Sequence, residues 1–150
     1  MSSAKDRAMS HDGVSATQLR VRYAETDQMG FAHHSNYLIW CEQARTDHMR
    51  VLGVGYRELE AGGLLLPVVD ARLRFKAPAR YDDLLTVRCW IREASSRRVI
   101  FGYAIERVAD GRLLATAQTS LMALGSDHER TTIPESVLQT LVVVPDPVRL

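Results

Sequence analysis

The chain has 150 residues, 46% hydrophobic and 25% charged, with a formal net charge of +1. This length and composition are typical of one globular domain with a single core. A charge so close to zero gives no electrostatic case for a nucleic-acid partner, and apolar runs of three or four residues are too short for stable membrane insertion. Two cysteines, Cys41 and Cys89, lack metal-ligand spacing, so we expect buried thiols and a reducing, cytoplasmic location.

The N-terminal part predicts a tail, a strand and a long helix. Residues 1–16 are polar and mixed in charge, and we expect a disordered tail before a domain over 17–150. Alternation of apolar and polar residues predicts a strand over 17–25, and helical spacing predicts a helix over 36–52. The face expected to be buried comprises Tyr37, Trp40, Cys41, Ala44, His48 and Val51, with the pairs Glu42–Arg45 and Asp47–Arg50 on the opposite side.

The rest of the chain predicts a meander of strands. Alternating patterns indicate strands over 68–76, 84–93, 97–109 and 112–124, and a short helix is expected from Pro134 to about Leu141. Strands joined by short turns pair antiparallel, and a sheet and a helix bury their apolar faces together. The sequence therefore predicts an α+β fold in which an antiparallel sheet curves around a central helix. Its unpaired edges favour association with a second copy.

The connection between the first strand and the helix carries the polar residues that indicate chemistry. Asp27 offers a carboxylate, Gly30 permits a tight turn, and His34 immediately precedes the helix. The N–H groups that open a helix carry partial positive charge and can stabilise a developing oxyanion. A carboxylate beside such a pocket is a minimal apparatus for hydrolysing an acyl compound. The alternative is that Asp27 only caps a turn or the helix.

The pattern Tyr-x-Glu-Thr-Asp-x-x-Gly-x-x-x-His-x-x-Tyr over 23–37 resembles the hotdog-fold acyl-CoA thioesterases, in particular the 4-hydroxybenzoyl-CoA thioesterase and YbgC-like group. The resemblance extends over about 17–130 and includes Glu42-x-x-Arg45. It implies an antiparallel sheet wrapped around one long helix. It also implies an enzyme that hydrolyses an acyl-CoA to a carboxylic acid and coenzyme A, as a homodimer or homotetramer with each site between two protomers.

The same resemblance assigns roles to residues. The carboxylate at the position of Asp27 acts in that family as nucleophile or as general base, and both roles remain open here. The backbone N–H at the position of His34 polarises the thioester carbonyl. Gly30 and Tyr37 are expected beside the substrate, with Tyr37 lining the acyl pocket or serving only as a core aromatic.

Phosphate binding and cofactors are the remaining expectations. Arg97 and Arg98 follow a predicted turn and are expected to bind the phosphates of coenzyme A, although a solvated turn is the alternative. His33 and His34 without a third ligand make a poor zinc site, so we expect neither metal nor cofactor.

Three other functions share this fold. The first is hydrolysis of an acyl-carrier-protein thioester, which uses the same chemistry on a protein-bound substrate. The second is a non-catalytic module that binds acyl-CoA without consuming it. The third is a hotdog dehydratase, whose histidine motif differs from the one seen here. The sequence leaves the acyl group itself undefined.

Overall fold

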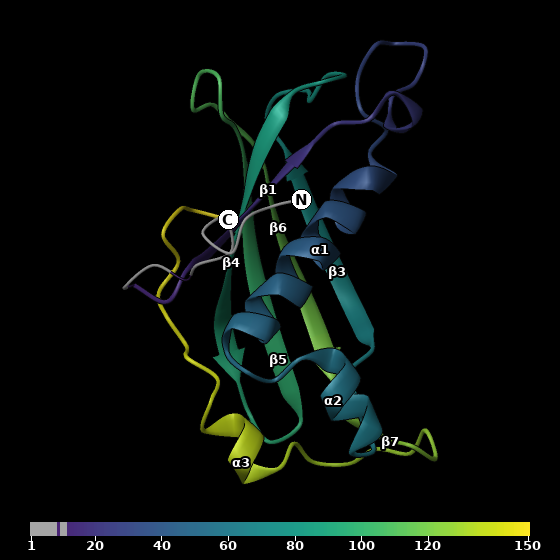
Figure 1. Ribbon diagram of the computed structural model, residues 1–150, viewed down its shortest axis with the longest axis vertical. Helices are drawn as coiled ribbons and strands as arrows, with labels where there is room; N and C mark the ends of the chain where they lie inside the picture. Colours follow the sequence, from purple (N-terminus) through teal and green to yellow (C-terminus); the bar gives the residue numbers. More distant parts are fainter. Residues whose placement is uncertain (1–8, 10–11) are drawn as a thin grey trace.

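The computed structural model describes residues 9 and 12–150, in which a five-stranded sheet packs against a long helix (Figure 1). The elements are β1 (Ser15–Arg20), the 3₁₀ turn η2 (Tyr23–Glu25), α1 (Ser35–Val51), α2 (Tyr56–Ala61), β2 (Leu64–Leu65), β3 (Val68–Phe75), β4 (Leu84–Ala94), β5 (Arg98–Arg107), β6 (Leu113–Met122), β7 (Leu124–Gly125) and α3 (Glu135–Leu138). The sheet order is β1-β4-β5-β6-β3, and every neighbouring pair is antiparallel.

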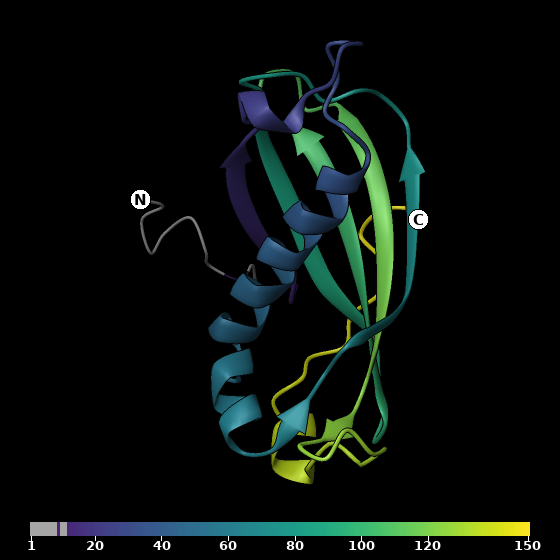
Figure 2. The ribbon, with the colours of Figure 1, turned by 90° about the vertical axis from the view of Figure 1, so that its right-hand side faces the viewer.

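The sheet curves around α1, which lies along its concave face (Figure 2). Each strand presents alternate residues to the helix, and α1 presents an apolar stripe in return. This arrangement confirms the predicted α+β architecture of one antiparallel sheet around a central helix. The four later strands are also confirmed, with ends within two residues of the predicted ones.

The prediction for the first strand was wrong at both ends. β1 begins at Ser15 and ends at Arg20, so Ser15 and Ala16, expected in the tail, belong to the sheet. Beyond Val21 the chain turns into η2, because the Glu25 carboxylate accepts a hydrogen bond from the Arg22 N–H at 2.7 Å. Most of the expected tail, residues 1–8, 10 and 11, lies outside the described residues.

The helix α1 begins one residue earlier than predicted and is more enclosed than its sequence suggests. Arg45 and Asp47, expected on the solvent side, are 8% and 2% exposed. Arg45 donates to the Tyr103 hydroxyl at 3.2 Å, and Asp47 accepts from the Thr17 hydroxyl at 2.9 Å. A sheet that wraps around a helix covers more than one stripe of it, which explains the error. Val51, expected in the core, is 41% exposed at the last residue of the helix.

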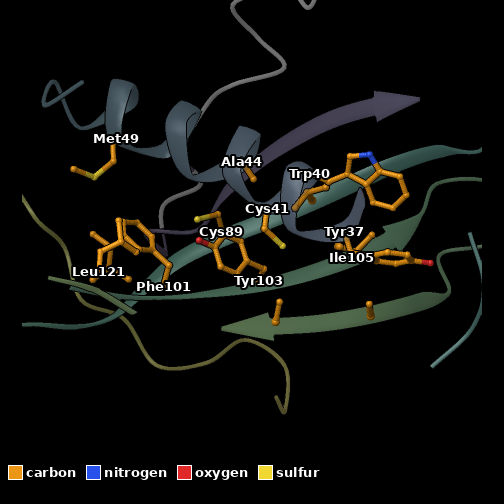
Figure 3. Packing of buried hydrophobic residues seen from close by; sticks show 14 of the residues in the cluster. Tyr37, Trp40, Cys41, Ala44, Met49, Cys89, Phe101, Tyr103, Ile105 and Leu121 are labelled. Carbon is orange, nitrogen blue, oxygen red and sulfur yellow. The ribbon is translucent and has the colours of Figure 1, made fainter. Parts of the chain in front are cut away.

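The core lies between α1 and the inner face of the sheet (Figure 3). Cys41 and Ala44 are fully buried and small, which lets the helix approach the strands closely. Phe101 and Tyr103 on β5 stack beneath them. Both thiols, Cys41 and Cys89, are free and buried, and burial raises the pKa of Cys41 to about 12.

Several short elements were not predicted. No element was predicted over α2 or β2, and β7 overlaps the last predicted strand only at Leu124; these elements have too few residues to show a clear periodicity. α3 is shorter than expected: it covers only Glu135–Leu138, with Pro134 as its N-cap.

The C-terminal segment covers the outer face of the sheet. Trp90 lies against Gly102, where an added Cβ would come within 2.5 Å of the indole. Asp146 accepts a hydrogen bond from the Trp90 indole at 2.9 Å and two from the Arg92 guanidinium at 2.8 Å. Val144 packs on the same cluster. These contacts fasten the end of the chain over the strands.

Candidate active site

The loop that enters α1 is a closed, hydrogen-bonded unit. Thr26 and Ala32 form an isolated antiparallel bridge. Within it the Asp27 N–H donates to the Phe31 carbonyl and the Gly30 N–H donates to the Asp27 carbonyl, both at 3.0 Å. Gly30 has a φ of +81°, a conformation that favours glycine. The glycine therefore closes the turn that fixes Asp27 opposite Phe31.

Asp27 is half-buried, and its two carboxylate oxygens differ in their contacts. Oδ1 accepts a hydrogen bond from the Met29 N–H at 2.9 Å, which is an Asx turn. For Oδ2, the described part of the chain provides no hydrogen-bond partner. The turn-capping alternative thus accounts for one oxygen, and the other is available to accept a proton or attack a carbonyl.

The start of α1 leaves one backbone donor unused. The His33 N–H donates to the Glu25 carbonyl at 2.8 Å, and the Asn36 and Tyr37 N–H groups donate to the carbonyls of His33 and His34. Among residues 9 and 12–150, none accepts a hydrogen bond from the His34 N–H. This N–H lies at the positive end of the 17-residue helix, where a negatively charged oxygen is stabilised.

The imidazole of His34 is exposed and stacks on that of His33, with ring centroids 4.1 Å apart. His33 Nδ1 in turn lies 2.9 Å from the Ser35 hydroxyl. The side chain of His34 therefore packs on its neighbour, whereas its backbone N–H has no acceptor in the part of the chain that the structure describes.

An apolar hollow of about 300 Å³ adjoins this helix start. Its walls are Phe31, Ala32, His34, Tyr37, Phe75, Lys76, Ala77 and Pro78. The rings of Tyr37 and Phe75 meet edge to face, with centroids 5.0 Å apart. The Tyr37 hydroxyl accepts a hydrogen bond from the Ala79 N–H at 3.1 Å, and burial raises its pKa. Tyr37 is thus both a wall of the hollow and a member of the core.

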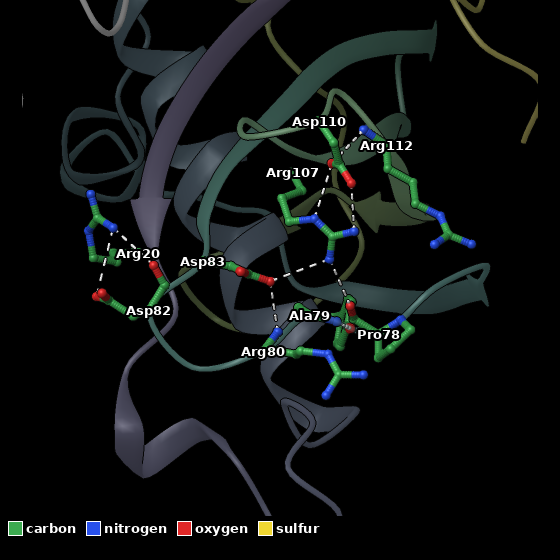
Figure 4. Close-up of polar contacts among 10 residues, drawn as sticks. Arg20, Pro78, Ala79, Arg80, Asp82, Asp83, Arg107, Asp110 and Arg112 are labelled. Atoms are coloured by element: carbon green, nitrogen blue, oxygen red, sulfur yellow. Dashed lines mark hydrogen bonds and ion pairs between the residues drawn. The ribbon is translucent and has the colours of Figure 1, made fainter.

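The turn before β4 holds the far wall of the hollow in place (Figure 4). Arg107 binds Asp110 through two hydrogen bonds of 3.1 and 2.9 Å, and lies 3.6 Å from Asp83. Asp83 accepts the Arg80 N–H at 2.9 Å. The Ala79 carbonyl accepts the Ala32 N–H at 2.8 Å, which joins this turn to the loop that carries Asp27.

Arg97 and Arg98 lie at the other end of β4 from this turn. They follow the last residues of β4, an 11-residue strand that spans about 35 Å, whereas the turn at Asp83 precedes its first residue. Arg98 pairs with Glu93 at 3.2 Å. His34 and Tyr37 therefore line the hollow, and the two arginines lie away from it. Asp27 and Gly30 are not among the lining residues, but they lie on the loop that contributes Phe31 and Ala32 to the wall.

Glu25, on the same loop, was not predicted to have a role here. Its carboxylate is only 4% exposed and accepts the Trp40 indole N–H at 2.9 Å. The local sequence indicates only that Glu25, three residues after Arg22, has the spacing of an acid that caps a helical turn. Its partner Trp40 lies 15 residues away, where no short-range pattern indicates a contact.

Two negative findings apply to the described part of the chain. Across residues 9 and 12–150, no three His, Cys, Asp or Glu side chains are grouped so as to hold a metal ion. In those same ranges, no helix combines the length and apolar character needed to cross a bilayer.

Comparisons with known proteins identify the family. The model of the thioesterase-like superfamily matches residues 21–141. YneP of Bacillus subtilis, provisionally described as an acyl-CoA thioesterase, is 41% identical over 107 residues, which cover 71% of this chain and 77% of YneP. A 1,4-dihydroxy-2-naphthoyl-CoA hydrolase of Thermosynechococcus vestitus is 30% identical over 131 residues, covering 86% of this chain and 89% of that protein.

A solved structure gives the same result. The DHNA-CoA thioesterase of Staphylococcus aureus superposes with a TM-score of 0.75 at 34% identity, covering 80% of this chain and 79% of that one. Residues 21–141, which the family model matches, contain the loop of Asp27, the helix α1 and the strands β3 to β6. The chain therefore belongs to the thioesterase-like superfamily, as a thioester hydrolase with the hotdog fold.

Proposed function

We propose that the protein is an acyl-CoA thioesterase that releases a carboxylic acid and coenzyme A. The observation that carries the proposal is the unpaired N–H of His34 at the wall of an apolar hollow. The half-buried Asp27, with one uncommitted oxygen, lies on the same loop. The named relatives act on 1,4-dihydroxy-2-naphthoyl-CoA and, provisionally, on acyl-CoA, which supports a coenzyme A thioester as substrate.

The chemistry needs an oxygen attacker and a stabilised carbonyl oxygen. In the general-base version, Asp27 accepts a proton from water while the water oxygen bonds to the carbonyl carbon. In the nucleophile version, Asp27 itself bonds to that carbon and water then cleaves the resulting anhydride. In both, the His34 N–H holds the oxyanion, whose collapse breaks the C–S bond and releases a thiolate. In the general-base version the thiolate takes up the proton that Asp27 accepted from water. In the nucleophile version it takes up the proton that is released when water cleaves the anhydride. An oxyanion donor such as the His34 N–H contributes roughly 10²–10³ in rate.

A second copy completes the site in this proposal. β3 is an edge strand with exposed apolar residues on it, including Val68, Val69 and Phe75 at 44%, 54% and 50% exposure. Antiparallel pairing of β3 with its counterpart, about a two-fold axis normal to the sheet, turns the partner end for end. The end that carries Arg97 and Arg98 in the partner then lies toward the Asp27 end of the first protomer. This supports a homodimer in which the arginines bind the phosphates of coenzyme A.

The two thiols fit the proposed compartment. Cys41 and Cys89 are both free and buried in the core. A reducing cytoplasm keeps such thiols unoxidised.

The decisive experiment compares Asp27→Asn with Asp127→Asn. Asp127 makes the same kind of turn, because its Oδ1 accepts the N–H two residues later at 3.0 Å, and it lies next to β7. Thiol release is measured over short, long and aromatic acyl-CoAs. We expect Asp27→Asn to lose about 10²–10⁴ in turnover and Asp127→Asn to match the wild type.

Three results would count against the proposal. Near-normal turnover by Asp27→Asn would remove the carboxylate from the mechanism. Recovery of intact acyl-CoA after prolonged incubation with the wild type would indicate a binding module. Strong preference for a matched acyl-carrier-protein thioester would assign the hydrolase to that substrate.

A further inference from the structure

Glu25 is a buried carboxylate that the proposed reaction does not use. It is 4% exposed, yet it lies two residues before Asp27. Oε1 accepts the Arg22 N–H at 2.7 Å and lies 3.5 Å from the Arg22 guanidinium. Oε2 accepts the Trp40 indole N–H at 2.9 Å. Because Trp40 is on α1 and is itself buried, this contact ties the loop to the second turn of the helix.

The backbone carbonyl of Glu25 binds the other end of the same loop. It accepts the His33 N–H at 2.8 Å and the Asn36 side-chain amide at 2.9 Å. Glu25 therefore contacts the helix at Trp40 through its side chain, and through its main chain it contacts His33, two residues before the helix, and Asn36 in the first turn.

These contacts set the orientation of the peptide that joins His33 to His34. The His33 carbonyl accepts the Asn36 N–H at 3.0 Å and the Asn36 side-chain amide at 3.3 Å. In a trans peptide the carbonyl and the N–H point in opposite directions. Fixing the carbonyl toward Asn36 therefore directs the His34 N–H away from the helix, where no described residue accepts it.

We propose that Glu25 is a positioning residue of the thioesterase site, which through Trp40 and Asn36 aims the His34 N–H at the substrate carbonyl. The inference rests on the proposed function, because it assigns Glu25 to the oxyanion donor of that reaction. Glu25 does not touch the substrate. It acts by holding the loop and the helix in one arrangement, so that the donor is in place before the substrate binds.

The geometry of the hydrogen bonds suggests two variants that test this role. Glu25→Gln keeps the size of the side chain but replaces one acceptor oxygen by an N–H₂ group, so it cannot accept from both Arg22 and Trp40. Trp40→Phe keeps a ring in the core and removes only the indole N–H. If the two act through the same contact, their effects on turnover are not additive in the double variant.

Asp47→Asn is the matched control. Asp47 is also a buried carboxylate on the inner side of α1, at 2% exposure, and it accepts a hydrogen bond from Thr17 at 2.9 Å. It lies 13 residues after His34, toward the opposite end of the helix. Its replacement lowers thermal stability without altering the loop of Asp27.

The measurements separate positioning from stability. At a temperature where all variants are folded, we expect Glu25→Gln and Trp40→Phe to lose about tenfold or more in kcat, with KM within about twofold of the wild type, since a single oxyanion donor contributes roughly 10²–10³. Asp47→Asn should keep the wild-type kcat. Polarisation of the substrate carbonyl can be measured with a bound acyl-CoA analogue that has CH₂ in place of sulfur. On binding, its carbonyl stretching frequency should fall by less in the two variants than in the wild type and in Asp47→Asn.

The outcomes distinguish this inference from the proposed function. Wild-type kcat and carbonyl frequency in both folded Glu25→Gln and Trp40→Phe would overturn the positioning role while leaving the thioesterase intact. If the wild type hydrolyses no thioester, the function itself fails. In that case the backbone ¹⁵N–¹H resonance of His34 in the free protein still tests the structural step: it should shift in Glu25→Gln and stay unchanged in Asp47→Asn, and an unshifted resonance would contradict it.

Discussion

The imidazole Nδ1 of His48 lies 2.6 Å from the hydroxyl of Ser15, in a part of the core where His48 has no exposed surface. The same hydroxyl donates to the Cys89 carbonyl at 3.3 Å. With its proton directed to Cys89, the hydroxyl oxygen accepts from Nδ1–H, which makes His48 the neutral Nδ1 tautomer. Protonation would therefore place the added proton on Nε2, which is buried and has no hydrogen-bond partner among the described residues.

Burial of His48 predicts that the free energy of unfolding falls in mild acid. Burial lowers the pKa of His48 from 6.5 to about 4, against the opposing effect of a hydrogen bond to the Cys89 backbone. Below pH 6.5 the unfolded chain takes up a proton that the folded protein does not, so the free energy of unfolding falls until about pH 4. The difference of about 2.5 pKa units corresponds to about 3 kcal/mol.

Urea unfolding measured at intervals between pH 4 and pH 7 checks this prediction. His48→Leu cannot titrate, so the slope of unfolding free energy against pH should be smaller in that variant. Equal slopes in the wild type and in His48→Leu would show that other groups cause the acid dependence.

If the proposed dimer forms through the edge strand β3, a charge on that strand should weaken it without unfolding the single chain. Val69 is 54% exposed on this strand, so an aspartate there remains solvated in the monomer and becomes buried only on pairing. We expect Val69→Asp to raise the dimer dissociation constant at least tenfold, which is about 1.4 kcal/mol, and to lower turnover at low protein concentration.

Val108→Asp is the control for that change. Val108 is 43% exposed but follows β5, away from the edge strand. Sedimentation equilibrium and turnover as a function of protein concentration give the comparison. A Val69→Asp protein that stays dimeric and active would show that β3 is not the dimer interface.

If Arg97 and Arg98 bind the phosphates of coenzyme A, as proposed, replacing them should raise KM only for substrates that carry those phosphates. No described residue binds the side chain of Arg97, whereas Arg98 is held by Glu93 at 3.2 Å. A charge-assisted hydrogen bond contributes about 1.5–3 kcal/mol. Arg97→Ala should therefore raise KM for acyl-CoA by about tenfold or more, and Arg98→Ala by less.

Acyl-pantetheine, which has the thioester but lacks the nucleotide and its phosphates, serves as the control substrate. Its KM should be the same for the wild type and both variants. An equal rise for both substrates would mean that the arginines act on the structure of the turn.

Local pattern was sufficient for the elements that are long and regular. The alternation over 84–93 and 97–109 predicted β4 and β5 to within two residues, because a strand with one buried face must alternate. The helix was predicted equally well from apolar residues at helical spacing, including Cys41 and Ala44. Short elements failed: η2 replaced the expected end of the first strand because of a single contact, the Glu25 carboxylate on the Arg22 N–H.

Burial of charged side chains could not be anticipated from helical spacing. Arg45 and Asp47 follow a pattern typical of a solvated face, but the curvature of the sheet encloses them and Tyr103 and Thr17 supply their partners. Those partners come from β5 and β1, at sequence separations of 58 and 30 residues. A search for helical or strand periodicity uses windows of about 11–18 residues, which are too short to contain both members of either pair.

The sequence by itself determined the class of fold, because alternation over 68–124 indicates successive strands, and the helix that begins near His34, because its residue types lie within one short segment. Only the tertiary structure decided that no described residue accepts the His34 N–H, that Glu25 is buried against Trp40, and that Arg97 lies at the other end of β4 from the Asp27 loop. The physical reason is that periodicity records which side of an element faces the core. Which atoms satisfy one another there depends on strands and turns that meet only after the chain has folded.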